Sequence, residues 1–338
     1  MRLRTATVCA SLSVVIVAIT VAVVLVKKQR RQPPPPRAGF YVNDGRLYDA
    51  NNKDFIMRGV GHAHTVHSGH TASTITSVKS LGANTVRLEI STGAVWDKNG
   101  VADITNLISL CRKSHLICVL VAHDTTGWGF RDGAIPQAQA VDYWISIKSA
   151  LAGQEKYVVI NVANEPYVLD NYQKWPADTI DAVNRLRRAG LHHTLMVDAP
   201  DWGQDRSFTM RDNAAAVFNS DPDRNTIFSI HMYGAFDRAA KVADYLKGYV
   251  NAKLPIVITE FGYMHSDGEV DEEAIMSEAQ VHGLGYLGWS WSGNGGDVPY
   301  LDMVTDFDAG MLTPWGNRVF NGASGIRQTS REASVYAT

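Results

Sequence analysis

Residues 157–166 read YVVINVANEP, and this stretch decides the fold. Its apolar and β-branched residues are typical of a strand that is buried on both faces of a parallel sheet. Pro166 cannot donate the next ladder hydrogen bond and favours an extended Glu165, so this carboxylate is expected where the strand leaves the sheet. Residues 254–262, LPIVITEFG, repeat the arrangement and place Glu260 after a second apolar run. Parallel α/β folds carry their functional residues at such strand ends.

Apolar runs alternate with amphipathic helical patterns through the rest of the chain, with no change of composition. We predict strands at residues 56–61, 85–90, 117–123, 158–164, 195–198, 227–231, 255–260 and 285–290. Eight such units in about 280 residues predict a (β/α)8 TIM barrel, of the α/β class. An open dinucleotide-binding sheet is disfavoured because no glycine-rich loop follows the first strand. The sequence FYVNDGRLY at residues 40–48 predicts a short β-hairpin before the barrel, closing one of its ends.

The N-terminus has a different character. Val8–Val26 contains no charged residue and is long enough for a helix that crosses a bilayer. We interpret it as a transmembrane or signal-anchor helix, with a cleaved signal peptide as the alternative. The chain would then lie on the extracellular face of a membrane, or be secreted if the segment is cleaved. The four basic residues that follow the span, against two before it, slightly favour the opposite orientation.

The predicted organisation is an anchor at residues 1–31, a proline-rich linker at 32–38, one domain at 39–330 and a tail at 331–338. The formal net charge is −2, and no basic stripe follows residue 37, so nucleic acid is not expected as a partner. A monomer is expected. Cys111 and Cys118 flank one tight connection and are close enough for a disulfide, with two buried reduced thiols as the alternative.

Polar or aromatic residues follow nearly every predicted strand, and a barrel gathers these positions on one face. They are His62, His64, Arg87, His123, Asp124, Asn164, Glu165, Asp198, His231, Tyr233, Glu260, Trp289 and Trp291. Any one of them has an ordinary structural explanation, but the whole set predicts an active site. Two glutamates at strand ends suit glycoside hydrolysis, which uses a pair of carboxyl groups.

Five of these motifs resemble family-five glycoside hydrolases of clan A, in the same order. They are NTVR at 84–87, NEP at 164–166, HMY at 231–233, TEFG at 259–262 and WSW at 289–291. The resemblance covers about residues 40–330 and is closest to bacterial-type endo-β-1,4-mannanases, through residues 55–59, 106–110, 194–199, 202–204 and 263–268. One departure is Val121, where related mannanases often carry a glutamate two residues before the histidine of the third strand.

The resemblance implies a retaining double displacement. Glu165 would be the general acid and base, and Glu260 the nucleophile. Four further residues would support them: Arg87, Asn164, His231 and Tyr233. The implied contacts to substrate are His62, His64, His123, Trp202, Trp289 and Trp291, with Trp128 as a further candidate. No cofactor and no metal are implied, and the substrate would be β-mannan or a related plant-type polysaccharide.

Three alternatives stay open. Four histidines within residues 61–70 could begin a metal site that His123, His231 and Asp198 complete, although this would leave the glutamate pair unexplained. An endo-β-1,4-glucanase would use the same catalytic pair. A membrane-tethered glycan-binding protein could share the scaffold, but it would not need Glu165, Glu260 and Arg87.

Overall fold

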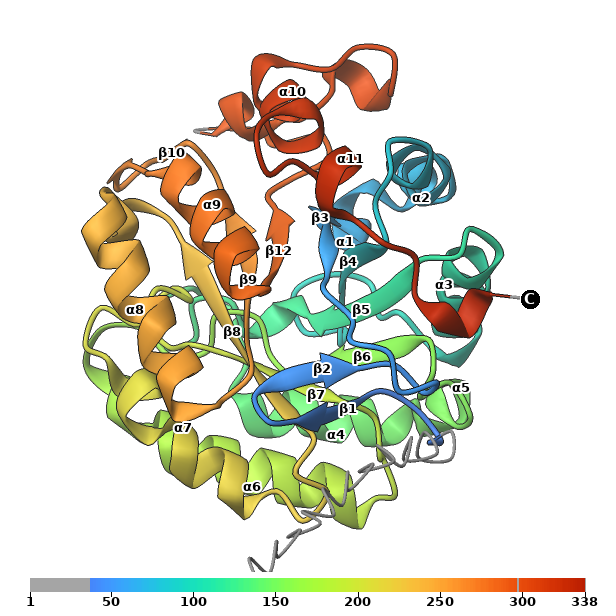
Figure 1. Ribbon diagram of the computed structural model, residues 1–338. Coiled ribbons are helices and arrows are strands. Elements are labelled where there is room, and N and C mark those ends of the chain that lie inside the picture. Colours follow the sequence, from blue (N-terminus) through green and yellow to red (C-terminus); the bar gives the residue numbers. More distant parts are fainter. Residues whose placement is uncertain (1–36, 297, 338) are drawn as a thin grey trace, which may run out of the picture. The chain divides into compact units, whose positions relative to one another are not determined.

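A computed structural model describes residues 37–296 and 298–337 of the chain. Eight parallel strands close into a barrel with the order β12-β3-β4-β5-β6-β7-β8-β9 (Figure 1). Their bounds are β3 Arg58–His62, β4 Thr85–Ile90, β5 Ile117–Ala122, β6 Val158–Asn161, β7 Leu195–Asp198, β8 Thr226–Met232, β9 Ile256–Phe261 and β12 Gly285–Gly288. All eight predicted strands are therefore present, and the (β/α)8 prediction is confirmed. The largest difference is β6, which ends three residues earlier than predicted.

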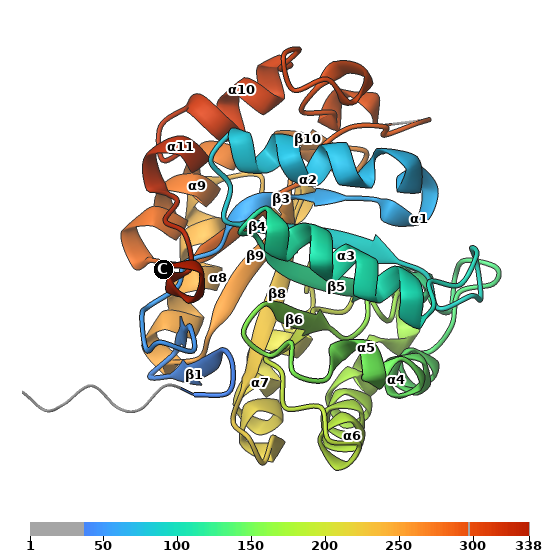
Figure 2. The same ribbon diagram turned by 90° about the vertical axis from the view of Figure 1, so that its right-hand side faces the viewer.

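Helices surround the barrel on its outer side (Figure 2). The α-helices are α1 His64–His67, α2 Thr71–Ser80, α3 Val101–Lys113, α4 Gln137–Ser146, α5 Lys148–Leu151, α6 Trp175–Arg188, α7 Thr209–Ser220, α8 Ala239–Ala252, α9 Glu272–His282, α10 Pro314–Asn321 and α11 Ile326–Thr329. Short 3-10 helices, including η2 His123–Thr125 and η4 Gly234–Phe236, follow several strands. A small hairpin, β10 Met264–His265 with β11 Gly268–Glu269, follows β9.

Side chains alternate between the inside of the barrel and the surrounding helices, as successive residues of a strand must. In β5, Ile117 and Val119 belong to the apolar cluster inside the barrel, whereas Cys118 and Leu120 belong to the layer beneath the helices. The inner cluster fills the end of the barrel at which the strands begin. Inward-facing residues two and four positions further along each strand can therefore be polar, because they lie at the open end of the barrel.

The predicted N-terminal hairpin is present as β1 Tyr41–Asn43 paired with β2 Arg46–Tyr48. Phe40, Leu47 and Phe55 are buried and pack against the inner cluster of the barrel. The hairpin thus closes the end opposite the predicted site and keeps water from the core.

Two further predictions, a disulfide and a membrane span, have different outcomes. Cys111 and Cys118 are both buried free thiols, so the disulfide considered above is not formed, and burial raises the pKa of the Cys118 thiol. No helix within residues 37–296 and 298–337 is long and apolar enough to cross a membrane. The predicted span Val8–Val26 lies outside the described residues and stays a prediction.

Candidate active site

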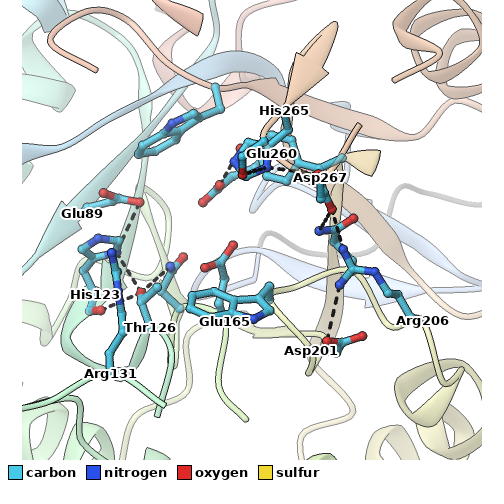
Figure 3. A pocket seen from close by; sticks show the side chains of 16 residues that line it. Glu89, His123, Thr126, Arg131, Glu165, Asp201, Arg206, Glu260, His265 and Asp267 are labelled. Carbon is cyan, nitrogen blue, oxygen red and sulfur yellow. Dashed lines mark hydrogen bonds and ion pairs between the residues drawn. The ribbon is translucent and has the colours of Figure 1, made fainter. Parts of the chain in front are cut away.

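A cavity of about 580 Å³ opens where the barrel strands end (Figure 3). It is lined by Glu89, His123, Thr126, Arg131, Asn164, Glu165, Asp201, Trp202, Gln204, Arg206, Tyr233, Glu260, His265, Ser266, Asp267 and Trp289. Both predicted catalytic glutamates are among these residues. The structure therefore brings Glu165 and Glu260 together in one cavity at the face that the strand-end argument indicated.

Glu260 is held through both carboxylate oxygens. Arg87 Nη1 donates to Oε1 at 2.6 Å, and the Tyr233 hydroxyl donates to Oε2 at 2.9 Å. Burial and the charge of Glu260 raise the pKa of Tyr233 well above its ordinary value, so its hydroxyl stays a donor. A register irregularity in the β8–β9 ladder sets His231 opposite Glu260. The carboxylate is thus fixed in one orientation at the floor of the cavity.

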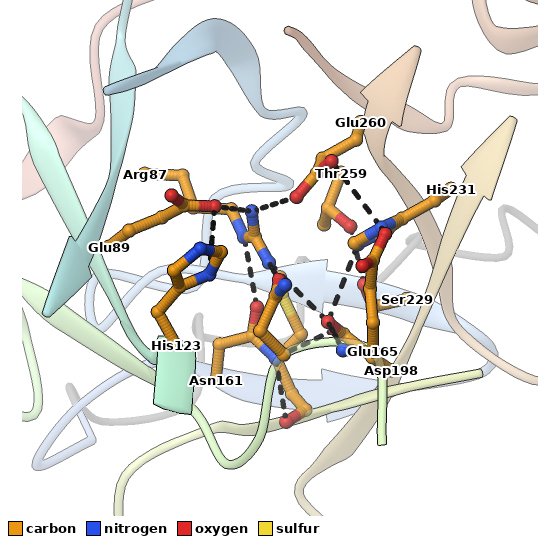
Figure 4. A network of polar contacts seen from close by, with 12 residues as sticks. Arg87, Glu89, His123, Asn161, Glu165, Asp198, Ser229, His231, Thr259 and Glu260 are labelled. Atoms are coloured by element: carbon orange, nitrogen blue, oxygen red, sulfur yellow. Dashed lines mark hydrogen bonds and ion pairs between the residues drawn. The ribbon is translucent and has the colours of Figure 1, made fainter. Parts of the chain in front are cut away.

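Arg87 is the centre of the polar network beneath the cavity and is fully buried (Figure 4). Besides Glu260, it donates from Nε to Asn161 Oδ1 at 3.0 Å and from Nη2 to Asn164 Oδ1 at 2.5 Å. Burial would lower the pKa of Arg87, but the surrounding carboxylates outweigh burial and raise it. Its planar guanidinium group therefore orients Glu260 and Asn164 together.

Glu165 lies beside His231, with 2.9 Å between Glu165 Oε1 and His231 Nδ1. Burial lowers the pKa of His231, but Glu260, Asp198 and the hydrogen bonds of the ring raise it to about 10. Burial raises the pKa of Glu165, yet the hydrogen bond and charge of His231 outweigh burial and lower it. In the free protein the shared proton therefore resides on His231, one hydrogen bond away from Glu165.

Two residues to which the sequence argument gave no role beside Glu165 hold this pair in place. Asp198 Oδ2 lies 3.4 Å from His231 Nε2, accepts from the Glu165 amide at 3.3 Å, and keeps a low pKa of about 2 through its cationic neighbours despite burial. Gly203 has a φ of +69°, and a Cβ there would lie 2.5 Å from the His231 ring. The motif at 202–204 thus needs glycine because its backbone packs directly on His231.

His123 follows β5 at the edge of the cavity, and Trp96 stacks on its ring with 5.1 Å between centroids. The Thr126 hydroxyl donates to the His123 carbonyl and accepts from Asn164, so it can only accept from His123 Nδ1, at 3.2 Å. Burial lowers the pKa of His123 to about 4. The ring is therefore neutral, with its proton on Nδ1 and a free acceptor on Nε2.

Glu89 is a third glutamate of the cavity that the sequence argument missed. It lies two residues after Arg87 on β4, and its carboxylate is 3.4 Å from His123 Nδ1. Its partner in the β4–β5 ladder is Val121, the position where a glutamate was noted as missing. The carboxyl next to His123 is thus supplied by the neighbouring strand. Strand alternation was the available signal, because residue 89 faces the same way as Arg87.

The predicted aromatic contacts divide into two groups. Trp289 and Trp202 line the cavity, and Arg131 and the exposed ring of Phe130 lie near Trp202. Trp291 is fully buried and packs edge-on against Phe320, so it is part of the core. Trp128 does not line the cavity and packs against Tyr167.

His62 and His64 do not line the cavity. Both are buried, and both contact the Thr71 hydroxyl, at 2.9 Å from His62 Nε2 and 2.7 Å from His64 Nδ1. The predicted sugar contacts are therefore replaced by a structural link between β3 and α2. The same geometry does not assemble a metal site from these histidines. Within the described residues, the one histidine and carboxylate group compact enough to share an ion is Glu165, His231 and Glu260.

Asp267 joins three of the loops at the cavity rim. Its carboxylate accepts from Gln204 Nε2 at 2.8 Å, from Arg206 Nη2 at 2.5 Å and from the Gly234 amide at 3.1 Å. These partners lie after β7 and β8, whereas Asp267 lies in the turn between β10 and β11. His265, in the same hairpin, packs on Tyr233 with 4.3 Å between ring centroids. The hairpin thus supports the residue that holds Glu260.

The mouth of the parallel barrel holds two buried glutamates. Arginine and tyrosine fix one of them, and histidine fixes the other. This arrangement defines a glycoside hydrolase. The chain belongs to glycosyl hydrolase family 5: residues 48–295 match the family model described as "Cellulase (glycosyl hydrolase family 5)". The predicted family resemblance is confirmed.

Individual relatives agree with this assignment. The chain is 55% identical over 299 residues to the mannan endo-1,4-beta-mannosidase of Streptomyces lividans, covering 88% of this chain and 78% of that protein. It is 46% identical over 302 residues to the Cellvibrio japonicus (strain Ueda107) protein of the same name, covering 88% and 70%. The solved structure of the beta-mannanase from Thermomonospora fusca matches with a TM-score of 0.87 and 54% identity, covering 88% of this chain and 99% of that one.

Proposed function

We propose that this protein is a retaining endo-β-1,4-mannanase. The observation that carries the proposal is the spacing of the two glutamates: oxygens of Glu165 and Glu260 lie within 4.8 Å of each other, and both approach His231. Retaining enzymes hold their carboxyl groups about 5–5.5 Å apart, whereas inverting enzymes leave about 6.5–9.5 Å for a water molecule. The short spacing leaves no room for that water and supports direct attack by Glu260.

In the first step Glu260 attacks the anomeric carbon and forms a covalent ester with the sugar. The bond to the glycosidic oxygen breaks, and this oxygen takes the proton of Glu165. Arg87 and Tyr233 hold both oxygens of Glu260 in one orientation until the bond forms. In the second step Glu165 takes a proton from water, whose oxygen attacks the anomeric carbon and releases Glu260.

The proton of the first step comes from the Glu165–His231 pair. The pair holds one proton, and the 2.9 Å hydrogen bond lets it move from His231 to Glu165 as the leaving oxygen gains charge. Neutralising Glu260 by ester formation removes one of the charges that keep the proton on His231. Attack by the nucleophile and delivery of the proton therefore promote each other.

The mannan assignment rests on the relatives, four of which carry mannanase names, and on neighbours solved with mannotriose and mannohexaose. A second candidate substrate is a β-1,4-glucan. One relative, 47% identical over 272 residues, is named "Beta-mannanase/endoglucanase A", although the chain covers only 20% of that protein. The catalytic pair is suited to both substrates.

The test is reducing-sugar release from β-mannan and from carboxymethyl-cellulose by the purified domain. Glu260→Ala and Glu165→Ala should each lower turnover by about 10²–10⁴-fold, while Glu269→Ala, an exposed glutamate of β11, should not. NMR of the first product should show the β-anomer. Release of the α-anomer would refute retention, and a fully active Glu260→Ala variant would refute the mechanism. Activity on cellulose alone would refute the mannan assignment.

We also propose that the enzyme acts as a monomer held at the outer face of a membrane by Val8–Val26. The uncharged span and the proline-rich residues 32–38 that follow it support this location. In a bacterial host, activity should sediment with membranes and be accessible to mannan added to intact cells. Activity found only in the medium would favour a cleaved signal instead.

A further inference from the structure

Glu89 has no role in the mechanism above, yet it is built into the cavity. Its side chain is only 2% exposed, and it lines the cavity together with Glu165 and Glu260. Figure 4 shows it on the far side of Arg87 from Glu165. Burying a carboxyl group is costly unless it has hydrogen-bond partners.

The partners that the protein offers to Glu89 are poor. Its two contacts are His123 Nδ1 at 3.4 Å and Arg87 Nη1 at 3.6 Å, both longer than ordinary hydrogen bonds. His123 Nδ1 is nearer to Thr126, and Arg87 Nη1 is nearer to Glu260. Within the described chain both nitrogens are thus engaged elsewhere, and the carboxyl of Glu89 faces the cavity with unused hydrogen-bonding capacity.

The charges around the site explain why this carboxyl can be neutral. Burial, reinforced by the nearby Glu260, raises the pKa of Glu89 well above its ordinary value, and Arg87 only partly offsets the increase. A neutral carboxyl both donates and accepts a hydrogen bond. This is the requirement for pairing with a hydroxyl group, which also does both.

We propose that Glu89 is a substrate-binding residue that hydrogen-bonds a hydroxyl of the sugar whose anomeric carbon meets Glu260. The geometry that supports it is the shared arginine: Arg87 Nη1 lies 2.6 Å from Glu260 and 3.6 Å from Glu89, so the two carboxyls border one end of the same cavity. The proposal rests on the glycosidase function proposed above. It adds a third carboxyl that recognises the sugar without taking part in bond cleavage.

The ladder provides a matched test. Val121 is the register partner of Glu89 and faces the same side of the barrel, so a carboxyl moved from residue 89 to 121 stays beside His123. We would compare Glu89→Val, Glu89→Gln and the double variant Glu89→Val/Val121→Glu with the wild type. Kinetics on mannohexaose would give kcat and KM, and thermal unfolding would show that each variant folds.

Glu89→Val should lower kcat/KM about three- to tenfold, the effect of losing one hydrogen bond between neutral groups. In a Glu260→Ala background, calorimetry should show mannohexaose binding weakened by Glu89→Val. The double variant should recover part of both losses. Glu89→Gln, which keeps a donor and an acceptor, should lose less than Glu89→Val.

Native kcat/KM and native affinity in Glu89→Val would overturn the proposal. An effect that disappears in a His123→Ala background would also overturn it, because Glu89 would then act only by orienting His123. Wild-type protein that hydrolyses neither mannan nor mannohexaose would refute the proposed function itself. Failure of this inference is distinguishable, because it would leave wild-type turnover intact.

Discussion

Replacing Arg87 by lysine tests whether the geometry of the guanidinium, and not only its charge, creates the site. Arg87 donates hydrogen bonds in different directions, from Nη1 to Glu260, from Nε to Asn161, and from Nη2 to Asn164 and Asp198. A lysine ammonium keeps the charge but carries its donors on one atom. We expect it to retain the contact with Glu260 and to lose those with the two asparagines.

The magnitude follows from these contacts. A hydrogen bond to a charged group contributes about 1.5–3 kcal/mol, so losing two costs about 3 kcal/mol or more. Domains are stable by about 5–15 kcal/mol, so Arg87→Lys should still fold. Asn164 would no longer be held against the substrate and Glu260 would be less well oriented. If a similar 3 kcal/mol is lost from the transition state, kcat/KM falls about a hundredfold.

Arg58→Lys is the matched control. Arg58 is also fully buried, but it lies at the start of β3 and donates to Thr329, Gln280 and two backbone carbonyls. Urea unfolding should show comparable losses of stability in both variants. Mannan hydrolysis by the folded protein should fall only in Arg87→Lys. Equal turnover in the two variants would refute the idea that the arginine fork orients the catalytic residues.

Three further predictions concern other parts of the molecule. The pKa of His231 is raised from 6.5 to about 10, so its positive charge stabilises the fold fully below pH 6.5, and this stabilisation is lost as the pH rises through 10. His231→Asn should weaken the pH dependence of Tm in this range and move the alkaline limit of kcat/KM to lower pH. Unchanged profiles of Tm and kcat/KM against pH would contradict the proton shared between His231 and Glu165. Trp289→Ala should raise KM about three- to tenfold, because it removes an aromatic face from the cavity. Tm would be measured alongside to show that the variant folds. An unchanged KM would exclude stacking of a sugar ring on Trp289. Asp221→Asn should break the buried bidentate pair with Arg187 and lower the free energy of unfolding by about 3 kcal/mol, while kcat stays unchanged. Loss of kcat in the folded variant would speak against this purely structural role.

The sequence was sufficient to predict the barrel and to place Glu165 and Glu260 together at one end of it. Buried parallel strands appear in a sequence as long apolar runs. In a closed barrel, a carboxylate directly after such a run lies at the face where the strands end. Glu165 and Glu260 are both of this kind. Arg87 lies within its strand, but its charge among apolar neighbours made it equally visible.

The remaining errors have a common physical cause. A linear sequence shows where a strand ends but not which side chains turn into the cavity, because that depends on the register with neighbouring strands. His62 ends β3 and His64 begins α1, but both contact the Thr71 hydroxyl of α2 and not the cavity. Glu89 was overlooked because its partner Val121 becomes its neighbour only in the folded ladder.

The single carboxylate of Asp267 also has a consequence for protein engineering. Its contacts with Gln204, Arg206 and the Gly234 amide connect the loops after β7, β8 and β9, so these three loops depend on one another. A hairpin exchanged alone for that of another enzyme would remove one of the two carboxylates that pair with Arg206, and would remove His265 from Tyr233. Chimaeras intended to broaden the range of polysaccharides should therefore transplant residues 201–206, 234–236 and 263–269 as a unit, and should leave the barrel beneath them untouched.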